Sequence, residues 1–378
     1  MLLLLREPKK GKRVAHKGRI AWIDWARALG ACSIVLLHVL VSTSRAVDVG
    51  AARLAVYDFV SIVCCRWAVP AFFMISGYLL LDPGRSLSWK QAGRYARRMA
   101  LVLATFGLAF ALMEEALGAL QAHGEWLQVL PRAVVDVLTA STWDHLWYVY
   151  AILAVYLLLP LLRSLAHKIG TRGFTIFAGT LFAGVLGVPT AAGAIQSIAG
   201  VDVSATGAVL ADFLAPVLGI KAATLVSNTA IGVTCTCLGS CLHGRKLTRR
   251  LVAVGVGSCA LMVLLSEKSL AAGLGDAGYV FLQGSCLAAL YAVFVLLALR
   301  FAVGEQRLRS QSVVAKLARD SFGVYVVHPF FIHLALMLTD PLALPPGLYE
   351  SLLFAGTLAA SVGSTRLVRR IPLIGTLF

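Results

Sequence analysis

The sequence predicts an all-α protein, a polytopic bundle of about ten transmembrane helices with both termini in the cytoplasm. Of its 378 residues, 59% are hydrophobic and only 14% are charged, a composition too apolar for a soluble domain. The apolar residues form long runs, which bilayer-spanning helices require. The formal net charge of +16 comes from lysines and arginines that gather between these runs. The positive-inside rule explains that charge better than a nucleic-acid partner does, so no nucleic acid is expected.

The charged residues divide the chain into three parts. Residues 1–19 form a basic cytoplasmic tail, residues 20–365 the membrane domain, and residues 366–378 a short cytoplasmic tail. The eight cysteines lie mostly within apolar runs, and we expect them to pack as small side chains rather than to form disulfides.

The first helix covers residues 19–42, and further apolar runs follow it. They cover residues 54–81, 99–120, 145–163, 173–191, 223–243, 251–266, 277–300, 321–339 and 348–365. Pro70 should bend the second helix in its middle. Residues 82–98 should form a basic cytoplasmic loop and residues 121–144 an acidic external loop. Residues 192–222 are predicted either as an external loop with a short interfacial helix or as part of a longer sixth helix.

The first helix carries a polar stripe. Arg27 and His38 lie about 20° apart around an α-helix and roughly 16 Å apart along it. Ionisable groups inside a membrane helix usually mark a site or a pathway. His38 is the candidate general base, because a neutral histidine accepts a proton near neutral pH. Arg27 suits a phosphate or a carboxylate, and Asp24, one turn earlier, is its candidate orienting partner.

The second helix ends with Ser76, Gly77 and Tyr78. No Gly-x-Ser-x-Gly elbow surrounds Ser76, which disfavours a serine hydrolase. Gly77 should allow close backbone approach, and Tyr78 is more typical of a core. Ser76 and Gly77 remain candidate cofactor contacts at this helix end. Three arginines before the third helix determine topology and are further candidates for binding an anionic cytosolic cofactor: Arg94, Arg97 and Arg98.

Other candidates are less specific. His328 is a second intramembrane histidine; we expect it to be packed and hydrogen-bonded, and it is the next candidate base. His145 and Trp147 begin the fourth helix, where an aromatic belt at the membrane interface is expected. Cysteines and a histidine at 235–243 match no zinc-site spacing, so no metal is expected.

Four stretches resemble the acyltransferase-3 family of integral membrane acyltransferases. They are residues 20–40 (IAWIDWARALGACSIVLLHVL), 69–81 (VPAFFMISGYLLL), 145–162 (HLWYVYAILAVYLLLPLL) and 321–329 (SFGVYVVHP). Asp24, Arg27 and His38 fit the family's order of Asp, then Arg, then ten residues, then His. Arg94 and Arg97 fit the spacing of its arginine pair near the third helix.

The resemblance implies about ten helices and transfer of an acyl group, usually acetyl, from a cytosolic coenzyme A thioester. The acceptor would be a hydroxyl of an exopolysaccharide, lipopolysaccharide or lipid-linked glycan, and Arg27 and His38 would be the essential pair. We expect a stand-alone member, without an added extracellular domain, in a bacterial cytoplasmic (inner) membrane. Whether an acyl-histidine forms stays open.

A secondary transporter or flippase is the alternative, because intramembrane Arg27 and His38 beside a proline-broken helix would also serve substrate or proton passage. The two halves of the sequence show no convincing repeat, which favours the enzyme.

Overall fold

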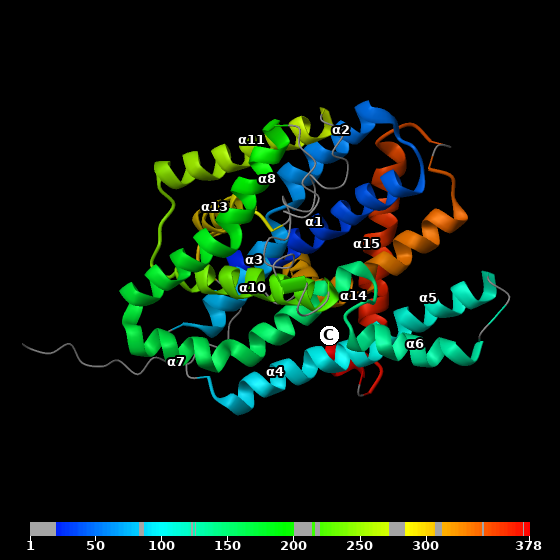
Figure 1. The fold of residues 1–378 in the computed structure, drawn as a ribbon, viewed down its shortest axis with the longest axis horizontal. Helices are drawn as coiled ribbons and strands as arrows, with labels where there is room; N and C mark the ends of the chain where they lie inside the picture. Colours follow the sequence, from blue (N-terminus) through cyan, green and yellow to red (C-terminus); the bar gives the residue numbers. More distant parts are fainter. Residues whose placement is uncertain are drawn as a thin grey trace, which may run out of the picture.

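The protein is a bundle of helices arranged around α1 (Ala21–Ala46), as Figure 1 shows. The computed structural model describes residues 20–82, 87–121, 124, 126–199, 214–215, 220–271, 284–306, 312–341, 344–372 and 374–378. The tail predicted at residues 1–19 lies outside these ranges.

The helices after α1 are α2 (Gly50–Val60), α3 (Ala68–Leu80), α4 (Trp89–Val102), α5 (Leu108–Gln121), α6 (Trp126–Leu138), α7 (Trp147–Leu181), α8 (Val188–Ala199), α10 (Ile220–Ser240), α11 (Arg249–Ala271), α13 (Cys286–Val303), α14 (Val313–Leu338) and α15 (Leu348–Val368). Among the described helices, three pairs are joined end to end by π-helical turns, at Ser61–Cys65 (α2 to α3), Leu103–Gly107 (α4 to α5) and Phe182–Gly187 (α7 to α8).

The predicted all-α transmembrane bundle is confirmed. Within the described ranges, nine helical stretches are long and apolar enough to cross a membrane. One of them, Trp147–Ala199, bends at Gly170, where φ is +69°. That bend separates the predicted fourth and fifth spans, because a positive φ interrupts an α-helix and suits glycine.

The structure corrects two segments that were predicted as loops. The basic segment predicted as a loop at 82–98 is largely helical, because Ser88 and Gln91 form a capping box that starts α4 at Trp89. The segment predicted as an external loop at 121–144 contains helix α6.

The bend predicted at Pro70 is wrong, because the irregular backbone lies before Pro70 in the sequence. The irregular backbone covers the π turn at Ser61–Cys65 and the two residues after it, and Pro70 lies in the first turn of α3. A proline there removes only an N–H group that has no partner within its own helix. For residues 192–222, α8 reaches Ala199, and residues 200–213 and 216–219 lie outside the described part of the chain.

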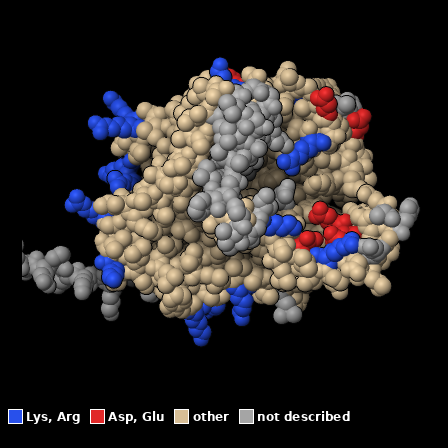
Figure 2. All heavy atoms as spheres, in the orientation of Figure 1, with Lys and Arg blue, Asp and Glu red and all other residues tan. Residues whose placement is uncertain are grey.

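The helix contacts position the site. Helix α1 packs against α14, α3, α15 and α13, and α4 packs along α7. Lysine and arginine side chains project from the left edge of the molecule in Figure 2, where α7 turns and the chain enters α11 in Figure 1. The cytoplasmic end of the bundle is therefore expected on this side.

Candidate active site

A cavity of about 480 Å³ lies among α1, α3, α4, α7, α14 and the C-terminal residues. Four arginines line it: Arg27, Arg98, Arg319 and Arg369. Hydroxyl-bearing residues and apolar residues complete the wall, among them Ser76, Tyr148, Tyr156, Ser321, Tyr325, Ile34, Val69, Phe72 and Ile152. A cavity that combines several guanidinium groups with an apolar wall suits an anionic ligand with an apolar or amide-bearing chain.

Helical spacing accounts for the wall that α1 and α14 contribute. Arg27 and Ile34 are two turns apart on α1, and Ala318, Phe322 and Tyr325 follow one another by one turn on α14. Each helix therefore presents one stripe to the cavity. Asp24, one turn before Arg27, is 2% exposed.

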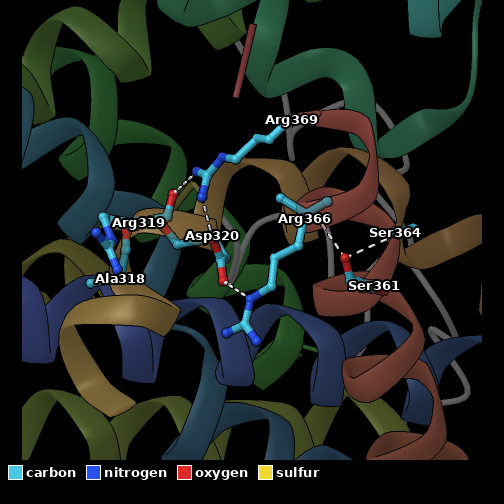
Figure 3. Close-up of polar contacts among 9 residues, drawn as sticks. Ala318, Arg319, Asp320, Ser361, Ser364, Arg366 and Arg369 are labelled. Atoms are coloured by element: carbon cyan, nitrogen blue, oxygen red, sulfur yellow. Dashed lines mark hydrogen bonds and ion pairs between the residues drawn. The ribbon is translucent and has the colours of Figure 1, made fainter. Parts of the chain in front are cut away.

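The guanidinium of Arg369 is held by a buried carboxylate, as Figure 3 shows. Asp320 on α14 is 2% exposed and lies between two arginines of the last helix. Its Oδ2 accepts from Nε of Arg366 at 2.9 Å, and its Oδ1 accepts from Nη1 of Arg369. A second amino group of Arg369, Nη2, donates to the backbone carbonyl of Arg319.

The C-terminal residues cover the arginine end of the cavity. Nε of Arg98 donates to the carbonyl oxygen of Leu377 at 2.8 Å, and the Arg98 guanidinium lies 5.7 Å from the ring centre of Phe322. The ring of Phe378 lines the cavity and packs against Phe106 and Phe322, with centroids 4.8 and 6.2 Å apart.

Three histidines meet beyond the opposite end of the cavity. The ring centroids of His38 and His328 are 4.8 Å apart, and those of His328 and His145 are 5.6 Å apart. His38 follows Ile34 by one turn and His328 follows Tyr325 by one turn, and both Ile34 and Tyr325 line the cavity. The histidine cluster therefore begins where the cavity ends.

The hydrogen bonds of these rings determine their tautomers. Nδ1 of His38 lies 2.9 Å from the carbonyl oxygen of Ile34. Because a carbonyl only accepts, the neutral ring carries its proton on Nδ1, and Nε2 keeps the basic lone pair. His328 has the same arrangement, with Nδ1 2.8 Å from the carbonyl oxygen of Tyr325. Nε2 of His328 is buried and has no hydrogen-bond partner among the described residues.

Tyr325 lies where the cavity meets the histidine cluster, because it lines the cavity and its ring lies 6.1 Å from that of His328. Its hydroxyl donates to the backbone carbonyl of His145, and its ring lies 5.4 Å from that of Tyr148. Nε2 of His145 in turn donates to the carbonyl oxygen of Val326 at 3.1 Å. Tyr325 and Tyr148 therefore line the cavity beside the histidine cluster.

The structure brings some of the sequence-predicted residues together. Arg27, Ser76 and Arg98 line one cavity, and His38 and His328 share one cluster. His145, expected at an interface, is instead buried in that cluster at 4% exposure.

Other predicted residues lie elsewhere. Arg94 and Arg97 are exposed and do not line the cavity. The backbone of Gly77 contacts that of Thr236, Tyr78 stacks on His243 with centroids 4.1 Å apart, and Trp147 packs beside Phe73.

Sequence reasoning missed several lining residues: Arg319, Arg369, Tyr148, Tyr156 and Phe378. The positive-inside rule accounts for both arginines without any site. Asp320 was a signal in the sequence that could have pointed to them. It is an acidic residue in an otherwise basic segment, and a buried carboxylate needs a positively charged partner.

Comparison with known protein families gives a match over nearly the whole chain. A family model described as an acyltransferase domain, Acyl_transf_3, matches residues 20–366. No curated protein and no solved structure matches the chain. The matched range contains Arg27 and His38 of α1, Ser76 of α3 and His328 of α14.

Proposed function

Because the chain belongs to the acyltransferase-3 family and is a multi-pass membrane acyltransferase, we propose that it transfers an acetyl group from cytosolic acetyl-coenzyme A. The acceptor is a hydroxyl of an exopolysaccharide, lipopolysaccharide or lipid-linked glycan, and the membrane is the bacterial inner membrane. One observation carries the proposal: a cavity lined by four arginines, with a cluster of three histidines next to its lining residues Ile34 and Tyr325.

The arginine end suits the donor's phosphates. Guanidinium groups bind phosphate oxygens in pairs of parallel hydrogen bonds, and they stay charged at any physiological pH. Arg27 and His38 are separated by roughly 16 Å along α1, a distance that a pantetheine arm spans when extended. With the phosphates at Arg27 and Arg98, the thioester reaches the region of Tyr325 and Ile34, directly below the histidines.

The proposed chemistry uses His38 as the base. Nε2 removes the proton of the acceptor hydroxyl while the hydroxyl oxygen attacks the carbonyl carbon of the thioester. A C–O bond forms, the C–S bond breaks, and the proton on His38 passes to the departing thiolate, which leaves as coenzyme A. His328 packs against His38 and restricts the orientation of its ring.

Sealed membrane vesicles test the donor's side. Radiolabelled acetyl-coenzyme A should label the acceptor in inside-out vesicles, where the arginine end of the cavity faces the medium, and should fail to do so in right-side-out vesicles. Vesicles from a strain carrying His38→Gln are the matched control and should show no labelling in either orientation.

Two outcomes would contradict the proposal. Equal labelling in both orientations would place the donor's entrance on the wrong side. Gradient-driven uptake of a solute, with no acylation in any vesicle, would favour the transporter.

A further inference from the structure

Asp320 lies beside the cavity but is not part of its wall. It is buried on α14 between Arg366, in the last turn of α15, and Arg369, the residue that follows α15 (Figure 3). The two arginines differ in one respect. Arg369 lines the cavity, whereas the Arg366 side chain is 52% exposed and does not.

A buried carboxylate is unfavourable unless opposite charges and hydrogen bonds satisfy it. One arginine would supply a fork of N–H groups for this purpose, yet Asp320 binds two. The bond from Arg369 to Asp320 therefore does more than satisfy the carboxylate. Together with the bond from Arg369 to the Arg319 carbonyl, it restrains the Arg369 guanidinium at the cavity. Within the described part of the chain, two of the five N–H groups of Arg369 are used in these bonds, and the other three can donate to a ligand.

The restraint opposes a repulsion. Arg98 lies within electrostatic range of Arg27 and Arg369, so the cavity gathers like charges that would move apart if they were free. A long arginine side chain also loses rotamer freedom when it binds, and a group that is already ordered loses less. A fixed carboxylate behind Arg369 therefore keeps a phosphate-binding group in place before the ligand arrives.

From these contacts we infer that Asp320 is a positioning residue for the donor: it holds Arg369 so that this arginine, together with Arg98, binds a phosphate group of coenzyme A. The inference rests on the proposed function and extends it, because it assigns donor recognition to the contact between α14 and α15 as well as to α4. Asp320 itself does not touch the donor.

The alternative is that Asp320 only ties α14 to α15. Arg366 supplies the matched control, because it binds the same carboxylate from the same helix without lining the cavity. A tie between helices depends on both arginines, whereas positioning depends on Arg369 alone.

The experiment measures coenzyme A binding by calorimetry, with the full chain in nanodiscs of neutral lipid so that no anionic headgroup competes. Asp320→Asn should weaken binding about tenfold, which corresponds to ~1.4 kcal/mol. The affinity of Arg366→Gln for coenzyme A should stay within about twofold of the wild-type affinity, because Arg366 does not line the cavity. In turnover, Asp320→Asn should raise the donor KM rather than lower kcat.

A double-mutant cycle links the two partners. Arg369→Gln should also weaken binding, and adding Asp320→Asn to it should cause little further loss. If Asp320→Asn does not fold, Arg369→Gln alone still tests the inference. Wild-type affinity for coenzyme A in Arg369→Gln would overturn it.

The outcomes separate the two proposals. If the wild type binds coenzyme A and Asp320→Asn binds it equally or more tightly, the positioning role is wrong and the proposed function stands. An equal loss in Arg366→Gln would reduce Asp320 to a tie between helices. If the wild type itself does not bind coenzyme A, both proposals fail.

Discussion

At His38, the 2.9 Å hydrogen bond from Nδ1 to the carbonyl oxygen of Ile34 determines which ring nitrogen can act as a base. The bond is local, four residues back along α1, so it persists whatever the ligand does. Nε2 is left with the lone pair, and the ring of His328 packs against the same histidine. The arrangement keeps one tautomer and one orientation, which proton abstraction requires.

Replacing His38 should therefore remove acyl transfer. General-base catalysis contributes about 10²–10⁴-fold, so His38→Ala should lower kcat by that order. His38→Gln should be similarly inactive, because glutamine keeps a hydrogen-bonding group but has no useful pKa. The measurement is acetyl transfer by membranes in which the amount of inserted protein has been matched.

Arg27→Lys is the control for this pair. It keeps the charge and loses the planar fork, so it should raise the donor KM more than it lowers kcat. Near-normal turnover by His38→Gln would assign His38 to packing and would make His328 the next candidate base.

Sequence alone predicted the part of this site that one helix contains. Arg27 and His38 share a face because α-helical geometry relates them directly. Helical spacing could not predict the places of Arg369 and His145. Each reaches the site through contacts with α14, and these contacts join residues that are far apart in the sequence. Arg94 shows the opposite error: its spacing fits the arginine pair of the family, but it lies on the exposed face of α4.

At the level of helices, α3 and α10 approach so closely that each needs a glycine at the contact. A Cβ added at Gly77 would meet the backbone carbonyl of Thr236, and one added at Gly239 would meet that of Met74. Neither neighbour is a flexible side chain, so a larger residue would have to move a whole helix. The contact holds Ser76 of α3 against the cavity.

Gly77→Ala should consequently destabilise the protein by about 1–3 kcal/mol, the usual cost of overpacking. The measurement is thermal unfolding of the purified protein in detergent. Gly118→Ala on α5 is the matched control: a Cβ there meets no atom within 4 Å, so alanine should be neutral or slightly stabilising. An unchanged midpoint in Gly77→Ala would mean that α3 and α10 separate easily.

The helices themselves were largely predictable, because long apolar runs leave few alternatives. Helix α6 was not, since the acidic balance of the whole segment 121–144 indicated an external loop. The apolar residues Leu127, Leu130 and Val134 of α6 nevertheless recur at helical spacing. The π turn before Pro70 was also invisible, because no residue type marks it.

For the molecule as a whole, the basic residues between the apolar runs predict the topology, and several of their side chains project from the left edge in Figure 2. Reporter fusions after residues 90, 168, 247 and 312 should all be cytoplasmic, and one after residue 48, in the turn between α1 and α2, should be external. The measurement is the activity of a reporter that works on only one side of the membrane.

An external signal at any of the first four positions would overturn the arrangement of both termini in the cytoplasm. If only the fusion after residue 247 were external, the error would lie in the crossings between α8 and α11, where residues 200–213 fall outside the described ranges.

The three π turns have a consequence for comparison with relatives. One residue added to a regular α-helix rotates everything after it by about 100°, but a π turn absorbs that residue and leaves the faces on either side in register. A relative lacking one residue within Ser61–Cys65 or Leu103–Gly107 would thus present the same side chains to the cavity. Alignments of such relatives should place their single-residue gaps inside these helices rather than at their ends.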